Sequence, residues 1–134
     1  MRIMSQDGNR FFDVGSEDIW KSIYYTAVVA FRYKKRNIHK ALAFMETGKC
    51  AAAEGYETAR QFNLIRDEFA KIPPEKVVYD LNNRTKKAPW MNNLSPVITS
   101  CANLFTTAEG QDLLFEVVSI LTYGQICDVD IIVE

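Results

Sequence analysis

The chain has 134 residues, of which 48% are apolar, 12% aromatic and 25% charged. This composition excludes a disordered or fibrous protein, and the length predicts one domain over residues 1–134 whose core needs no disulfide or metal. The formal net charge of −1 argues against a dedicated nucleic-acid binder.

The first residues predict a β-hairpin. Arg2–Met4 and Arg10–Val14 are short strand candidates on either side of Asp7-Gly8, a dipeptide that favours tight hairpin turns. The same N-terminal stretch is polar and lacks the apolar core of a signal peptide, so we expect a cytoplasmic protein.

Two helices are predicted next. Ser16 is a helix N-cap residue, and apolar residues then recur at helical spacing over residues 19–31. Because aromatic and β-branched residues crowd within Ile23–Phe31, a strand is the alternative for that stretch. A second helix is expected over Ile38–Glu46 and should end near Gly48, which readily adopts a left-handed cap conformation.

The middle of the chain predicts a third helix, a strand and a long turn region. The helix has one apolar stripe, which consists of Phe62, Ile65, Phe69 and Ile72. Pro73-Pro74 should end this helix, and Glu75–Leu81 has the pattern of a short buried strand. Asn82–Pro96 is polar or turn-forming, apart from Trp90 and Met91. We favour a structural position for Trp90 over the core, with a partner contact as the alternative.

The C-terminal region predicts one more helix and a final strand. Thr106 and Glu109 have the spacing of a capping box that opens the helix. The helix should extend as far as Gly124. Its buried face should contain Leu113, Leu114, Val117, Ile120 and Leu121. Val129–Val133 closes the chain as a strand. The predicted fold is α+β, with a short mixed or antiparallel sheet packed against three to four helices.

No catalytic or metal-binding pattern is recognisable. The only histidine, His39, is interpreted as a solvated or half-buried helix residue, and one histidine cannot build a zinc site on paired histidines. No C-x-x-C motif is formed by the three cysteines, which are Cys50, Cys101 and Cys127, and a reduced compartment is therefore favoured. Free cysteines are often buried, so we expect all three at core positions. We therefore expect no catalytic residue, no metal and no cofactor.

Charge is unevenly distributed along the chain, because all 16 Lys and Arg residues lie at or before Lys87. On the predicted last helix, Glu109, Asp112 and Glu116 would share one face, and on the last strand Asp128 and Asp130 would point to one side. These five residues, with Trp90, are candidates for docking a basic protein. Solubilising charge at a helix start is the alternative.

A basic run is the rival surface, and it consists of Arg32, Lys34, Lys35, Arg36 and Lys40. The run would contact nucleic acid or protein in a small regulatory module. The alternative is a solvated helix end, where cations are favourable.

Two stretches of the C-terminal half resemble a known family. Phe69–Asp80 reads FAKIPPEKVVYD and is followed by the Pro89-Trp90 turn, and Asn103–Leu113 reads NLFTTAEGQDL. Together they resemble bacterial immunity proteins of polymorphic toxin systems, the family numbered seventy in the immunity series. The similarity covers Phe69 to Glu134, whereas Arg36–Lys40 departs from the family pattern.

The longest uncharged stretch, Ala88–Ala108, is interrupted by prolines and asparagines, so we expect no membrane partner. The resemblance implies a non-enzymatic protein without catalytic residues. Such a protein binds and occludes the C-terminal domain of a secreted or contact-delivered toxin in the cytoplasm of the producing cell. The acidic C-terminal third adds the expectation that this toxin domain is basic, as many nucleases are.

Overall fold

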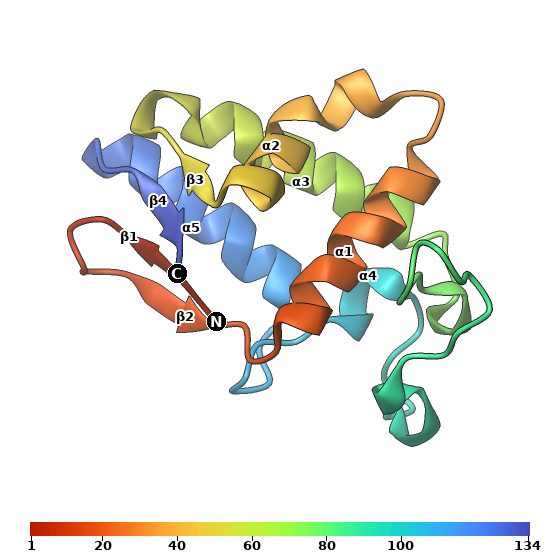
Figure 1. The fold of residues 1–134 in the computed structure, drawn as a ribbon. Coiled ribbons are helices and arrows are strands. Elements are labelled where there is room, and N and C mark those ends of the chain that lie inside the picture. The colour runs from red at the N-terminus through yellow and green to blue at the C-terminus, as the bar shows by residue number, and fades with distance from the viewer.

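A four-stranded antiparallel sheet packs against a group of helices in the computed structural model, which describes residues 1–134 (Figure 1). The strands are β1 (Arg2–Ser5), β2 (Phe11–Asp13), β3 (Lys49–Cys50) and β4 (Ile131–Val133), in the order β2-β1-β4-β3. The first and last strands pair at the centre, with Ile3 opposite Val133, so both chain termini lie at the sheet. The predicted α+β class is confirmed.

The N-terminal hairpin is confirmed, with a first strand one residue longer and a second strand two residues shorter than expected. Gly8 has a φ of +78°, the left-handed conformation that a tight turn requires and that glycine adopts without strain. The Asp7 carboxylate supports this turn by accepting hydrogen bonds from the Ser5 hydroxyl and from the Asn9 main-chain N–H.

The first two predicted helices are confirmed, and the strand alternative is wrong. Helix α1 (Glu17–Ala30) begins after Ser16, whose hydroxyl accepts a hydrogen bond from the Asp18 N–H at 3.1 Å. Helix α2 (His39–Thr47) ends at Gly48, which is left-handed with a φ of +75°. An aromatic cluster of Trp20, Phe44 and Phe62 ties both helices to the next one, with ring centroids 6.0–6.5 Å apart.

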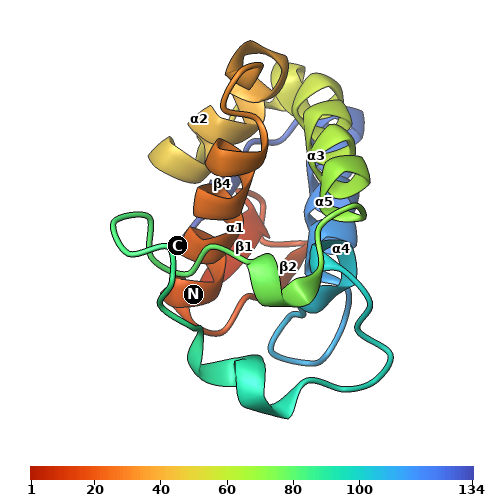
Figure 2. The same ribbon diagram turned by 90° about the vertical axis from the view of Figure 1, so that its right-hand side faces the viewer.

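Helices α3 (Gly55–Phe69) and α5 (Leu113–Cys127) lie side by side behind the sheet, and Figure 2 shows the pair edge-on. Gly55 allows the close approach, because a Cβ there would lie 2.3 Å from the Leu121 carbonyl oxygen. Helix α3 ends at Phe69, so Ile72 follows it in a turn. A fifth helix, α4 (Cys101–Leu104), has four residues and had no predicted counterpart.

The segment Glu75–Leu81 is not a strand, so that prediction is wrong. Its apolar pattern reflects real burial, since Val77 and Val78 are buried. The main chain of Val78, however, bonds to side chains of α1 instead of a neighbouring strand. Its N–H donates to Thr26 Oγ1 at 3.0 Å, and the Ser22 hydroxyl donates to its carbonyl at 2.9 Å. Two hydroxyl side chains therefore replace a strand partner.

The last helix begins at Leu113, and the predicted capping box of Thr106 and Glu109 is wrong. Residues 106–112 form a turn, in which the Thr107 N–H donates to the Gln111 carbonyl and Gly110 has a φ of +85°. Asp112 is the actual N-cap and accepts a hydrogen bond from the Phe115 N–H at 3.2 Å. The predicted buried face of this helix is confirmed, and the helix continues through Gly124 to Cys127.

Candidate functional site

Three adjoining hollows lie along the outward side of α1, and Lys21 lines all of them. The largest, about 320 Å³, lies between α1, α2 and the end of β4. The second, about 270 Å³, lies between α1 and α2, and the third, also about 270 Å³, lies between α1 and the residues that follow Val78. We call the three together the α1 groove.

The α1 groove is acidic and aromatic. Its carboxylates are Glu17, Asp18, Glu46, Asp80 and Glu134, and its aromatic residues are Trp20, Tyr24, Tyr25 and Tyr79. Lys21 and Lys86 are the only lysines among the residues that line it, and no arginine does. None of the five carboxylates forms an ion pair with a lysine or arginine of the chain. The groove as a whole therefore has a net negative charge, although the hollow beside residues 79–86 has two carboxylates and two lysines.

Two of these carboxylates hold tyrosines in place. The Tyr24 hydroxyl donates to Glu46 Oε1 at 2.5 Å, and this hydrogen bond is the main reason why the pKa of Tyr24 rises to about 12. The Tyr79 hydroxyl donates to Asp18 Oδ2 at 3.3 Å. Desolvation, followed by the charge of Asp18, raises the pKa of Tyr79 as well. The two hydrogen bonds therefore fix both tyrosine side chains beside groove carboxylates.

Trp20 is the unusual residue of the groove. Its side chain packs among core aromatic rings and is only 6% exposed, yet it lines two of the three hollows. Its indole N–H is the one buried side-chain polar group in the protein without a hydrogen-bond partner. Leaving such a donor unpaired costs about 1–3 kcal/mol, so most buried donors find a partner.

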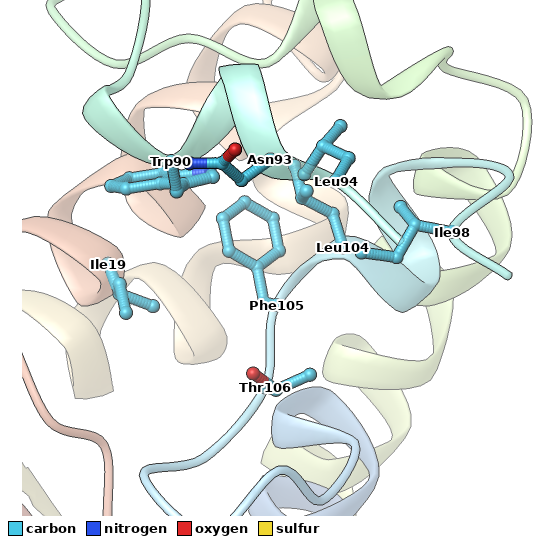
Figure 3. Close-up of a pocket in the computed structure, with 8 residues that line it drawn as sticks. All are labelled: Ile19, Trp90, Asn93, Leu94, Ile98, Leu104, Phe105 and Thr106. Atoms are coloured by element: carbon cyan, nitrogen blue, oxygen red, sulfur yellow. The ribbon is translucent and has the colours of Figure 1, made fainter. Parts of the chain in front are cut away.

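A separate apolar hollow of about 220 Å³ lies beside Trp90 (Figure 3). Trp90 and Phe105 point toward each other across it, and Ile19 of α1 forms another part of the wall. Trp90 is half-buried against the core, with its ring 5.4 Å from that of Tyr79. The structural position favoured for Trp90 is therefore observed, and its contact with a partner stays a prediction.

The five acids predicted from the sequence, here called the C-terminal acids, do not form a helical stripe. Glu109 lies in the exposed turn before α5, Asp112 caps the helix and only Glu116 lies within it. Asp128 and Asp130 precede β4, so they do not share a face of that strand. Both predictions of a shared face are wrong, because the chain is not helical from Thr106 and is not a strand from Val129.

Two of the five C-terminal acids already have partners from the N-terminal half. Asp112 Oδ2 lies 3.8 Å from Arg66 Nη2 of α3, and Asp130 Oδ2 lies 3.4 Å from Lys49 Nζ of β3. Asp130 also accepts a hydrogen bond from the Ala52 N–H at 2.9 Å. Folding places α3 beside α5 and β3 beside β4, so charges that are separated in sequence meet in space. A toxin-binding role for these acids stays a prediction.

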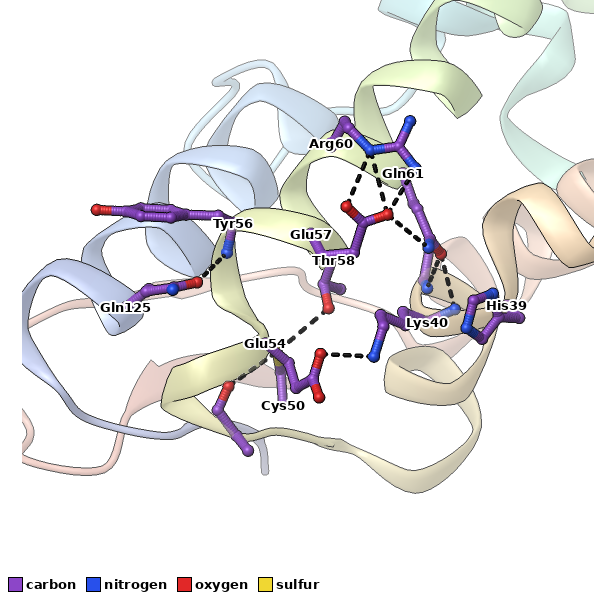
Figure 4. Close-up of polar contacts among 12 residues, drawn as sticks. His39, Lys40, Cys50, Glu54, Tyr56, Glu57, Thr58, Arg60, Gln61 and Gln125 are labelled. Carbon is purple, nitrogen blue, oxygen red and sulfur yellow. Dashed lines mark hydrogen bonds and ion pairs between the residues drawn. The ribbon is translucent and has the colours of Figure 1, made fainter.

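The basic run lies in the exposed connection between α1 and α2, except for Lys40, which lies in the first turn of α2. Arg32, Lys35 and Arg36 extend into solvent without an ion pair, whereas Lys34 Nζ lies 3.8 Å from Glu68. Lys40 bonds to Glu54 in the network of Figure 4. The last turn of α1 itself contains no basic residue, so the run does not cap the C-terminal end of that helix.

That network fixes one wall of the groove by attaching α2 to α3 (Figure 4). Helix α2 has no N-cap side chain of its own, and the buried Gln61 of α3 accepts hydrogen bonds from the Lys40 and Ala41 N–H groups at 2.7 and 3.1 Å. Gln61 is in turn held by Glu57. Hydrogen bonds from Arg60 and then Gln61 lower the pKa of Glu57 to about 2.

The cysteines and the histidine form no chemical centre. Cys50 and Cys101 are buried as expected, but Cys127 at the last turn of α5 is exposed, so the burial prediction is wrong for that residue. Burial raises the pKa of the Cys101 thiol to about 12. His39 is exposed, and its Nδ1 lies 2.8 Å from the Arg36 carbonyl oxygen. No three His, Cys, Asp or Glu residues come together as ligands for a metal ion.

None of the five helices combines the length and the apolar character that crossing a bilayer requires. Comparison with known proteins finds no match among curated proteins and none among solved structures. The family model of Immunity protein 70 matches residues 4–133. The match therefore extends beyond Phe69–Glu134 into the N-terminal half, in which Arg36–Lys40 departs from the family pattern. The chain therefore belongs to the immunity protein 70 family of polymorphic-toxin immunity proteins.

Proposed function

We propose that this protein neutralises one cognate toxin by forming a stoichiometric complex that covers the toxin's active site. The observation that carries the proposal is the family match over residues 4–133, because proteins of this family act as immunity proteins and are generally not enzymes. Residues 1–134 act as one binding domain in this proposal.

The proposed partner is the C-terminal domain of a secreted or contact-delivered toxin, with a basic surface of the kind that nucleases carry. The unpaired carboxylates of the α1 groove support a basic partner, since complementary charge speeds association and selects partners. The proposed site of action is the cytoplasm of the producing cell. Three free thiols, none of them in a disulfide, support a reducing compartment.

The alternative function is binding of nucleic acid or protein through the basic run. It is favoured by Tyr33, which is 89% exposed and has the Arg32 guanidinium 4.9 Å from its ring centroid. In the proposed function this surface stays free. A variant with Arg32→Gln, Lys35→Gln and Arg36→Gln should therefore bind the toxin domain as tightly as the parent, and a large loss of binding would favour the alternative.

The test uses the cognate toxin domain, for which the genes beside this one are searched. We expect co-expression of the protein to restore growth of cells that produce the toxin domain, and the purified proteins to elute as a complex with an equimolar composition. Inhibition of the toxin should be complete at equimolar protein. Lack of a complex, or full inhibition by a small fraction of an equivalent, would contradict stoichiometric occlusion.

A further inference from the structure

We propose that the α1 groove is the surface that binds the toxin, and that its occupant is an extended, lysine- or arginine-bearing segment of the toxin domain. This inference rests on the proposed immunity function and adds to it the docking surface and the kind of segment that is bound. Four properties of the groove support it, namely its charge, its length, its unpaired donor and its aromatic residues.

The charge of the groove fits a basic segment. Elsewhere on the protein, ion pairs with lysine, arginine or the N-terminal amine engage acids such as Glu54, Glu57 and Asp112. In the groove, five carboxylates face only Lys21 and Lys86, and none of them is paired. Negative charge of this kind attracts ammonium and guanidinium groups and repels the phosphates of nucleic acid.

The length of the groove fits a short stretch of chain. The α1 residues that line the hollows run from Glu17 to Tyr25, a stretch that at the usual rise of an α-helix corresponds to about 13 Å. The two hollows between α1 and α2 share Trp20, Lys21, Met45 and Glu46, and the hollow beside residues 79–86 adjoins them at Lys21 and Tyr25. An extended segment of about four residues covers that distance.

The indole N–H of Trp20 indicates that the segment is extended. Trp20 lines two of the hollows, and its buried N–H has no acceptor within the chain. An extended segment presents free main-chain carbonyls along its length, whereas the carbonyls of a helix are already bonded within the helix. A carbonyl of the bound segment therefore supplies the acceptor that the folded protein lacks.

The tyrosines of the groove add contact area for such a segment. Tyr24 and Tyr79 are held by Glu46 and Asp18, so little side-chain freedom is lost when a partner binds. Tyrosine is enriched among residues that dominate binding energy, and aromatic rings also attract lysine and arginine side chains.

The first experiment compares two charge reversals of equal size. The groove variant carries Glu17→Lys and Glu134→Lys, whose side chains make no hydrogen bond or ion pair, and the matched control carries Glu109→Lys and Glu116→Lys among the C-terminal acids. Association with the cognate toxin domain is measured by stopped-flow at low and high salt. We expect the groove variant to associate at least about tenfold more slowly at low salt, and the control to stay within about twofold of the parent.

The outcomes separate this inference from the proposed function. If the parent protein does not bind the toxin domain, the immunity function itself is contradicted. If the parent binds and the folded groove variant associates as fast as the parent, only the assignment of the groove is overturned. A slower control variant with an unaffected groove variant would place the interface at the C-terminal acids.

A second measurement uses the parent protein in the binding step and a variant only to assign its signals. The protein contains two tryptophans, so its ¹⁵N spectrum has two indole N–H signals, which a Trp90→Phe variant assigns. On addition of the toxin domain, we expect the Trp20 signal to move downfield as its N–H acquires an acceptor. A Trp20 signal that does not move when the toxin is bound would contradict the proposal.

Discussion

The α1 groove and the C-terminal acids each contain five carboxylates, but the two regions use them differently. In the C-terminal region, Asp112 and Asp130 bond to main-chain N–H groups and pair with Arg66 and Lys49. In the groove, no carboxylate has a cationic partner, and two of them hold tyrosines. The difference is that lysine and arginine compensate two of the five C-terminal acids, whereas no groove carboxylate has such a partner within the chain.

The largest effect should come from removing an aromatic side chain of the groove. We expect Tyr24→Ala to weaken toxin binding by about 2 kcal/mol, or roughly 30-fold in Kd, because tyrosines in an interface often dominate its energy. Tyr56→Ala is the matched control, since Tyr56 is exposed on α3 away from the groove. Titration calorimetry measures both. Equal loss in the two variants would remove the distinction between the groove and the rest of the surface.

The C-terminal acids should affect folding more than binding. Asp112→Ala removes the N-cap of α5, and we expect the free energy of unfolding to fall by about 1 kcal/mol. Urea denaturation measures this change, and binding of the toxin domain to the folded variant should be unaffected. Asp112→Asn keeps an N-cap acceptor and serves as the control that should retain most of the stability. If Asp112→Ala left stability unchanged but slowed toxin binding, the roles of the two regions would be reversed.

The central lysine of the groove offers a change in the opposite direction. Lys21 lines all three hollows, so Lys21→Glu should make the groove more negative and speed association with a basic toxin domain several-fold at low salt. Lys76→Glu makes the same charge change on an exposed residue outside the groove. Stopped-flow kinetics that show slower association for Lys21→Glu would indicate an acidic partner.

The smallest effect concerns the pair of Tyr24 and Glu46 at high pH. The ordinary pKa of tyrosine is 10.0, and in the folded protein the pKa of Tyr24 is raised to about 12. The hydrogen bond to Glu46 therefore contributes stability that is fully present below pH 10 and is lost as the pH rises through about 12. In an absorbance titration at alkaline pH, Tyr24 should lose its proton only near pH 12, which is the late phase of the curve. The Tyr24→Phe variant should show one tyrosine fewer in this late phase. A titration curve with the same late phase in that variant would contradict the raised pKa.

The elements that the sequence predicts correctly have local signals. Ser16 and Gly48 mark helix ends through their own chemistry, and Gly8 supplies the conformation of its turn. The strand expected at Glu75–Leu81 fails because burial of two valines does not reveal what their main chain bonds to. The partners, Ser22 and Thr26, lie more than 50 residues away in the sequence.

The candidate site was harder to predict, for related reasons. The Thr106 and Glu109 spacing matches a capping box, but Gly110 turns the chain before a helix can form, which removes the predicted acidic stripe. The α1 groove was missed because Tyr24 fits the apolar stripe of α1. The remaining walls come from α2 and from residues 79–86, which only tertiary packing brings together.

The most direct test of the central claim is a crystal structure of the protein bound to its cognate toxin domain. We predict an extended toxin segment along α1, with basic side chains beside Glu17 and Glu46 and a carbonyl oxygen within hydrogen-bond distance of Trp20 Nε1. A toxin domain seated on Glu109 and Glu116, with the α1 groove open to solvent, would contradict the account.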